Sequence, residues 1–83
     1  MTTIYLHTHA ADRIRNLQNP ERLLDFIARL ESNPTETCGE YSHTDPRGRV
    51  IEYKILGRYC MLFFKDPFAD LVKILDIRNL EAL

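Results

Sequence analysis

The amino-acid sequence predicts a single α+β domain over residues 1–83, in which a helical hairpin covers one face of an antiparallel sheet. Three observations predict this fold. A short run rich in β-branched and aromatic residues, 3–8, is typical of a first strand. Two stretches with helical apolar periodicity follow within 9–33. Three strand-like runs between 49 and 77, separated by two short turn signals, then predict a three-stranded antiparallel meander.

The helical hairpin is bounded by residues that start and stop helices. Thr8 is expected to cap a short first helix, HAADRIRNL. Asn19 is expected to cap the second helix, with Pro20 at its first position, where a missing N–H costs nothing. Asn33-Pro34 should end this helix, because the residue before a proline avoids the α region. The apolar face of the second helix is assigned to Leu23, Phe26, Ile27 and Leu30.

The segment after the hairpin contains a loop and the first strand of the meander. Residues 35–48 lack a clear period and are expected to form a loop, with a short strand at 40–42 left open. In the strand 49–56 apolar and charged residues alternate, which is typical of a strand with one face in solvent. The solvent face is assigned to Glu52 and Lys54, and the opposite face to Ile51, Tyr53 and Ile55.

The remaining meander strands follow two turns. Gly57-Arg58 indicates a tight hairpin, and the run 59–64 after it is apolar on both faces, which predicts the centre of the sheet. A longer turn, in which Pro67 supplies a fixed φ, leads to a last strand over 71–77.

The composition limits the function classes. There is no run of about 18 apolar residues and no basic stretch ahead of an apolar one at the N-terminus, so we expect neither a membrane span nor a signal peptide. Small secreted scaffolds usually carry more than the two cysteines present, Cys38 and Cys60, so reduced thiols in the cytoplasm are expected, with a disulfide left open. The net charge of −1 is unlike that of a dedicated nucleic-acid binder, although residues 43–83 hold seven Lys/Arg against six Asp/Glu.

Charged residues of the second half are candidates for RNA chemistry. Metal-free RNA cleavage needs a base for the 2′-hydroxyl, a cation for the crowded phosphate and an acid for the leaving oxygen. Small domains carry such charges all over their surface, so ordinary solvated residues are the competing interpretation. The candidate cations are Arg47, Arg49, Lys54, Arg58 and Arg78, and the candidate acid/base groups are His43, Asp45 and Glu52.

Metal, thiol and base-stacking sites have weaker support. His7, His9 and His43 lack a recognised ligand spacing, so no metal and no cofactor is expected. Cys60 has apolar neighbours, which favours a packed core thiol over a nucleophile. Aromatic residues at strand spacing are interpreted as core rather than as a base-stacking surface. They are Tyr53, Tyr59, Phe63, Phe64 and Phe68.

Several residues mark the order of elements along the chain. They are Asn33-Pro34 at the helix end, Gly48-Arg49 before the meander, Arg58-Tyr59 after its first hairpin, Phe63-Phe64 in the apolar strand, and Arg78 just after the run LVKILDI. These residues and the order of elements resemble the RelE/ParE toxin superfamily. The resemblance covers nearly the whole chain and rests on hydrophobic pattern and turn spacing.

This resemblance implies a toxin or toxin-like component of a bacterial toxin–antitoxin, or plasmid stabilisation, system. Members of the superfamily are neutralised by an antitoxin, so an antitoxin is the expected partner, with RNA on the ribosome or gyrase as target and a homodimer left open. Basic family positions match Arg49 and Lys54, and Arg78 lies near a third. His43 is the residue expected to supply proton transfer, because its ordinary pKa is near neutrality.

Two alternatives stay open beside the binding role. One is an active ribosome-dependent mRNA endonuclease, or mRNA interferase, and the other is an inactive toxin-derived interaction module. Cys60 stands after Tyr59 where the nucleases usually carry an arginine, and the C-terminal residues 79–83 lack the Tyr or His of those members. Both departures count against RNA cleavage.

Overall fold

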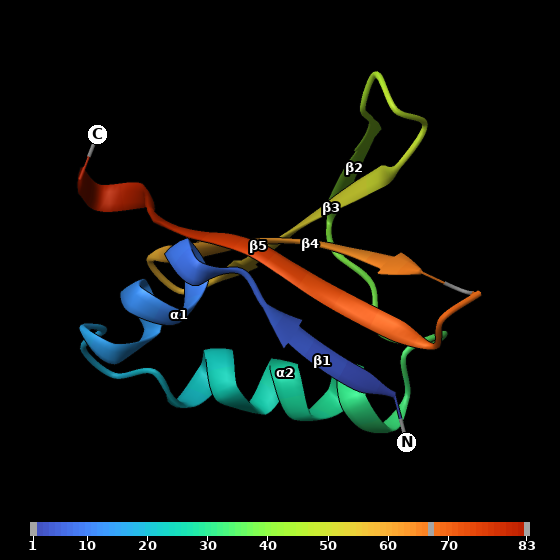
Figure 1. Ribbon diagram of the computed structural model, residues 1–83. Helices are drawn as coiled ribbons and strands as arrows, with labels where there is room; N and C mark the ends of the chain where they lie inside the picture. The colour runs from blue at the N-terminus through green and yellow to red at the C-terminus, as the bar shows by residue number, and fades with distance from the viewer. Residues whose placement is uncertain (1, 67, 83) are drawn as a thin grey trace.

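The computed structural model describes residues 2–66 and 68–82, and Figure 1 shows how the chain runs through them. The turn residue Pro67 and the last residue, Leu83, lie outside the described residues. The elements are β1 (Thr3–Leu6), α1 (Thr8–Arg15), α2 (Glu21–Ser32), β2 (Tyr41–Thr44), β3 (Val50–Leu56), β4 (Tyr59–Asp66), β5 (Leu71–Asn79) and the short 3-10 helix η1 (Leu80–Ala82). No helix in the described part of the chain is long and apolar enough to cross a membrane.

The strands form one five-stranded sheet in the order β1-β5-β4-β3-β2. The predicted antiparallel meander of β3, β4 and β5 is present, and β4 lies at the centre, as its apolar character on both faces indicates. β2 pairs antiparallel with β3, whereas β1 pairs parallel with β5. The sheet is therefore mixed: the predicted meander is antiparallel, and β1 adds to it in parallel. Parallel neighbours need a long crossover, and the helical hairpin supplies part of it here.

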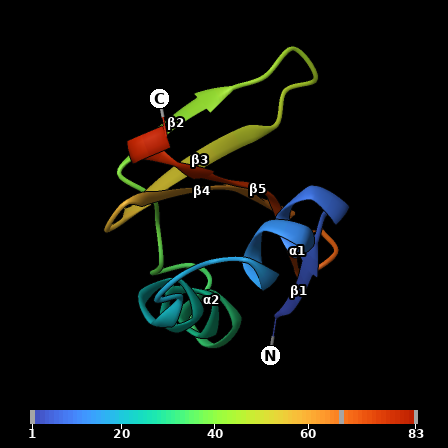
Figure 2. The ribbon, with the colours of Figure 1, turned by 90° about the vertical axis from the view of Figure 1, so that its left-hand side faces the viewer.

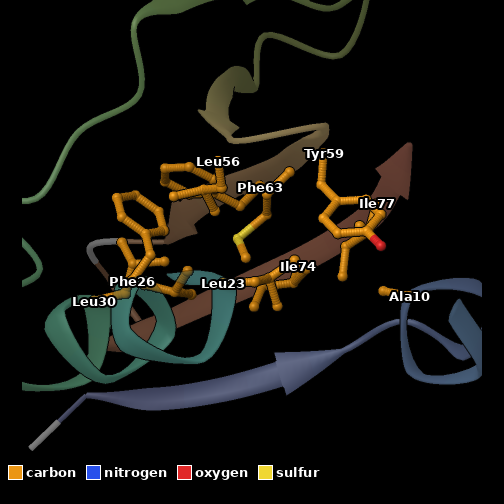
Figure 3. Packing of buried hydrophobic residues seen from close by; sticks show 11 residues of the cluster. Ala10, Leu23, Phe26, Leu30, Leu56, Tyr59, Phe63, Ile74 and Ile77 are labelled. Atoms are coloured by element: carbon orange, nitrogen blue, oxygen red, sulfur yellow. The ribbon is translucent and has the colours of Figure 1, made fainter. Parts of the chain in front are cut away.

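Both helices lie on the same side of the sheet, which the two views of Figures 1 and 2 show. The main core fills the space between these layers, and Figure 3 shows its side chains meeting between α2 and the sheet. Phe26 of α2 and Phe63 of β4 meet edge to face, with ring centroids 5.6 Å apart. The buried members of this core are Ala10, Leu23, Phe26, Leu30, Leu56, Tyr59, Met61, Phe63, Val72, Ile74 and Ile77.

The helix starts differ from the predicted caps. β1 ends at Leu6, and the first cap is His7, whose Nδ1 accepts from the His9 amide at 3.3 Å, so Thr8 is the first helical residue. Asn19 has φ +56° and Pro20 occupies the cap position of α2 without a side-chain hydrogen bond. The reason is the tight turn between the helices. It needs a left-handed residue, which asparagine tolerates, so the Asn19 side chain is not placed to accept from the first-turn amides.

The strand boundaries shift by one to two residues. β2 spans Tyr41–Thr44 rather than 40–42, because its pairing with β3 runs up to the hairpin that joins them. β3 begins at Val50, one residue after the predicted start. β5 extends to Asn79, since its last residues pair with the start of β4, so that Arg78 lies inside the strand and not after it.

The faces of β3 are the reverse of the predicted ones. Glu52 and Lys54 pair with Phe63 and Met61, two residues of the main core, and so lie on the helix side. The Lys54 ammonium is 5.5 Å from the Phe26 ring centroid. The predicted alternation is present, but the two faces are exchanged. A lysine stem can pack on apolar surface while its charged end reaches solvent at the edge of the core, so Lys54 can lie on the helix side.

Candidate functional site

We call the side of the sheet away from the helices the open face. Its centre is a second, smaller cluster drawn from the three meander strands. Ile51, Cys60 and Leu62 are buried in it, and Tyr53, Phe64 and Leu75 pack against them. Charged residues on this face therefore surround an apolar centre.

Arg49 is held at one end of the open face by the turn between β2 and β3. The Asp45 carboxylate accepts from the Arg47 and Arg49 amides at 3.0 and 2.8 Å, and its Oδ2 lies 2.7 Å from Arg49 Nε. Gly48 has φ +83°, which lets the turn close. The guanidinium carbon lies 5.0 Å from the Phe64 ring centroid, a cation–π contact.

His43 lies beside this arginine on the neighbouring strand. His43 pairs with Ile51. Ile51 is two residues after Arg49, so the two share one face of the sheet. The His43 side chain is exposed, and its ring centroid is 5.3 Å from that of Tyr53. A titratable imidazole and a cation thus share one end of the open face.

Arg78 lies at the other end. It pairs with Cys60, whereas Arg49 contacts Phe64, and these two β4 residues are about 13 Å apart along an extended strand. Its side chain is 61% exposed, with Nε 3.4 Å from Asp76 Oδ2. The sheet does not bring Arg78 next to Arg49.

Lys54 is on the opposite side of the sheet from Arg49, His43 and Arg78. Its Nζ lies 2.7 Å from Glu40 Oε1, and the other Glu40 oxygen accepts from the Ile55 amide at 2.9 Å. The hydrogen bond from Lys54, followed by that from the Ile55 amide, lowers the pKa of Glu40 below its ordinary value. Glu40 thus completes the edge of β3 next to β2. This role of Glu40 was not predicted, because a glutamate beside a strand gives no signal of it in the sequence.

The two acidic candidates, Asp45 and Glu52, make hydrogen bonds and ion pairs that stabilise the fold. Desolvation raises the pKa of Asp45, but the hydrogen bonds from Arg49 and the Arg47 amide outweigh it, so the carboxyl titrates below its ordinary range. Glu52 accepts from the Gly39 amide at 3.0 Å and lies 3.6 Å from Lys65 Nζ. An Asp45 that stays ionised at neutral pH is a poor general acid.

The other cations of the candidate set lie outside the open face. Arg47 belongs to the turn between β2 and β3, where its amide donates to Asp45. Arg58 follows Gly57 in the hairpin between β3 and β4, and its Nε is 3.9 Å from Glu81 Oε2.

The metal, thiol and aromatic candidates have structural explanations. The rings of His7 and His9 stack at 5.1 Å beside the cap of α1, and no group of His, Cys, Asp and Glu within the described residues is arranged to hold a metal ion. Cys60 is buried, as predicted, and burial raises the pKa of its thiol while Arg78 only partly offsets this. Phe68 is fully exposed, so its assignment to the core is wrong, because the turn before β5 turns it outward.

The geometry matches known protein structures over nearly the whole chain. A scan against protein-family models finds no match, and a search of curated proteins finds none either. Structural comparison shows that the chain has a RelE toxin-like fold. It is similar to a chain of the archaeal RelE–RelB complex from Pyrococcus horikoshii, with a TM-score of 0.78, 17% identity, and 99% of this chain and 98% of that one covered. It is also similar to a chain of the toxin–antitoxin complex RelBE2 from Mycobacterium tuberculosis, with a TM-score of 0.56, 21% identity, and coverage of 94% and 96%.

Proposed function

We propose that the protein is the toxin-like component of a toxin–antitoxin pair and works by binding a partner protein of the antitoxin type. The observation that carries this proposal is the whole-chain likeness to structures that are themselves toxin–antitoxin complexes. The match spans both helices and the full sheet, so it is not a likeness of one common motif.

The placement of the cations favours binding over RNA cleavage. The three cations that match or lie near basic positions of the RelE/ParE superfamily each have an acidic neighbour within the chain. These neighbours are Asp45 for Arg49, Glu40 for Lys54 and Asp76 for Arg78. A phosphate would have to compete with these carboxylates. Lys54 also lies on the helix side, away from His43. Stabilising a crowded phosphate needs donors already aimed at one point, and these residues do not supply that arrangement.

The binding proposal is tested by locating a short reading frame beside the gene and producing the chain that it encodes. Both chains are expressed together and purified through a tag on that second chain only. We expect a complex of defined stoichiometry, measured by light scattering. If the two chains are each folded and form no complex at micromolar concentrations, the proposal is overturned.

The endonuclease alternative has its own test on translating ribosomes. If new mRNA ends appear, cleavage should depend on Arg49 and His43, which share one end of the open face, and less on Arg78. Lys54→Ala serves as the matched control, because its side chain is on the opposite side of the sheet. Absence of new mRNA ends with a complex still forming supports a role in binding alone.

A further inference from the structure

An exposed phenylalanine lies in the turn between β4 and β5, at the end of the sheet where β1 begins (Figure 1). Phe68 is 100% exposed, so it takes no part in the core. The turn nevertheless holds its backbone in place. Asp66 Oδ1 accepts from the Phe68 and Ala69 amides at 3.0 and 3.3 Å, and the Asp70 carbonyl accepts from the Thr3 amide at 3.2 Å. An aromatic side chain on an ordered turn loses little conformational freedom when a partner buries it.

A small, largely apolar cleft lies beside this turn. Its volume is about 240 Å³, below the roughly 300–1,000 Å³ of small-molecule sites and closer to the size of a single side chain. Val72 and Thr2 are almost fully buried there, and Pro34 and Leu71 are half-buried. The lining residues are Thr2, Pro34, Thr35, Lys65, Asp66, Asp70, Leu71 and Val72.

The charged side chains that line the cleft each have a partner within the chain. Asp70 Oδ1 accepts from the Thr2 hydroxyl at 2.8 Å, and Asp66 Oδ1 accepts from the two turn amides. Lys65 Nζ lies 3.6 Å from Glu52 Oε2. A group that enters the cleft would therefore gain less from new hydrogen bonds than from the burial of apolar surface. The cleft suits an apolar side chain.

Phe68 and the cleft lie next to each other on one patch of the surface. Asp66 and Asp70 flank Phe68 along the chain, and both also line the cleft. Phe68 does not fill the cleft of its own chain, because it is fully exposed. A patch that carries both an exposed ring and a cleft for it is self-complementary. A two-fold axis between the two features would place each ring at the cleft of the other copy.

We propose that two copies of the protein form a symmetric dimer in which Phe68 of each copy fills the cleft of the other. The dimer removes two phenyl rings from water, and it does not depend on the toxin-like role. The contact is small, so we expect a dissociation constant in the high micromolar range. The protein is then a monomer at the low micromolar concentrations used for unfolding.

Sedimentation velocity of the purified protein over a hundredfold range of concentration tests the dimer. We expect the average mass to rise from that of one chain towards that of two. Phe68→Ala should weaken this association tenfold or more. Leu24→Ala removes an exposed apolar side chain from α2, outside the cleft lining, and should change it less than twofold. A protein that stays monomeric throughout, or a Phe68→Ala variant that associates like the parent, would overturn the proposal.

A mixing experiment tests whether the ring and the cleft belong to the same contact. Thr35→Arg places a long charged side chain at the exposed rim of the cleft and should also abolish the dimer. A mixture of Phe68→Ala and Thr35→Arg pairs an intact cleft with an intact ring and restores one of the two contacts. We therefore expect more dimer in the mixture than in either variant alone. Unchanged melting temperatures establish that both variants are folded.

Two outcomes of these experiments contradict the assignment. A mixture with no more dimer than its separate components would show that Phe68 does not enter this cleft. A Phe68→Ala variant that keeps its self-association but binds the antitoxin-type chain more weakly would assign the exposed ring to that partner instead of a second copy.

Discussion

Two glycines are required for different physical reasons at the scale of single residues. A Cβ on Gly39 would lie 2.6 Å from the Tyr53 carbonyl oxygen, a backbone atom that cannot move aside. Gly48 has open space around it but a φ of +83°. The first glycine lets the loop approach β3 closely, and the second closes the turn that holds Arg49.

These two glycines give a matched pair of alanine variants. Gly39→Ala should lower the free energy of unfolding by about 2–3 kcal/mol, because overpacking against backbone is costly. Gly48→Ala should lower it by only about 1 kcal/mol, the cost of a left-handed alanine. Urea unfolding at pH 7 measures both. Equal losses would mean that the close approach at Gly39 does not limit stability.

Glu40 makes stability depend on pH at the edge of β3. Its pKa is lowered in the folded protein, so its contribution is present above the ordinary value of 4.5 and is lost as the pH falls through the folded pKa. Glu40→Gln should therefore reduce the loss of melting temperature between pH 6 and pH 3. Glu36→Gln, an exposed position on the same loop, is the control. If both variants lose as much melting temperature on acidification as the parent, the contacts of Glu40 with Lys54 and Ile55 do not contribute to the free energy of unfolding.

At the scale of elements, residue type and period predicted most of what the structure contains. The spacing of Leu23, Phe26 and Leu30 identified the buried face of α2, and the apolar run from Tyr59 identified the central strand. Both signals are strong because the apolar positions recur along the whole length of each element.

The errors have a common cause in tertiary contacts that local patterns do not encode. Which side of β3 faces the helices depends on its register with β4, and Lys54 can lie on the helix side because its charge reaches Glu40. The parallel pairing of β1 depends on where the chain returns after the helices. For the same reason the candidate cations could be listed from the sequence, whereas their separation over two faces could not.

The packing of α2 on β4 places a buried aromatic pair in the main core. Phe63 is fully buried and meets Phe26 across the layers, so Phe63→Ala should lower the free energy of unfolding by about 3–5 kcal/mol. Phe68→Ala removes the same atoms from a fully exposed position and should change it by less than about 0.5 kcal/mol. Thermal and urea unfolding measure the difference, and similar values for the two variants would refute the core assignment.

At the scale of the whole molecule, several large apolar side chains are left in solvent. Tyr41 is 65% exposed, Ile55 38% and Leu80 39%. A partner chain that covers such residues would stabilise the protein in the complex. The protein purified alone should therefore self-associate as its concentration rises, as a homodimer or larger species, and the partner should suppress this. Light scattering that shows a monomer across a hundredfold concentration range would count against a partner requirement.

The growth of a bacterial host after induced expression tests the toxin-like role most directly. We expect growth to slow when the protein is expressed alone and to recover when an antitoxin-type chain from a neighbouring reading frame is expressed as well. The core variant Phe63→Ala, which should unfold more readily, should slow growth less than the parent. Undisturbed growth at a verified level of folded protein would contradict the toxin-like role and favour an inactive interaction module.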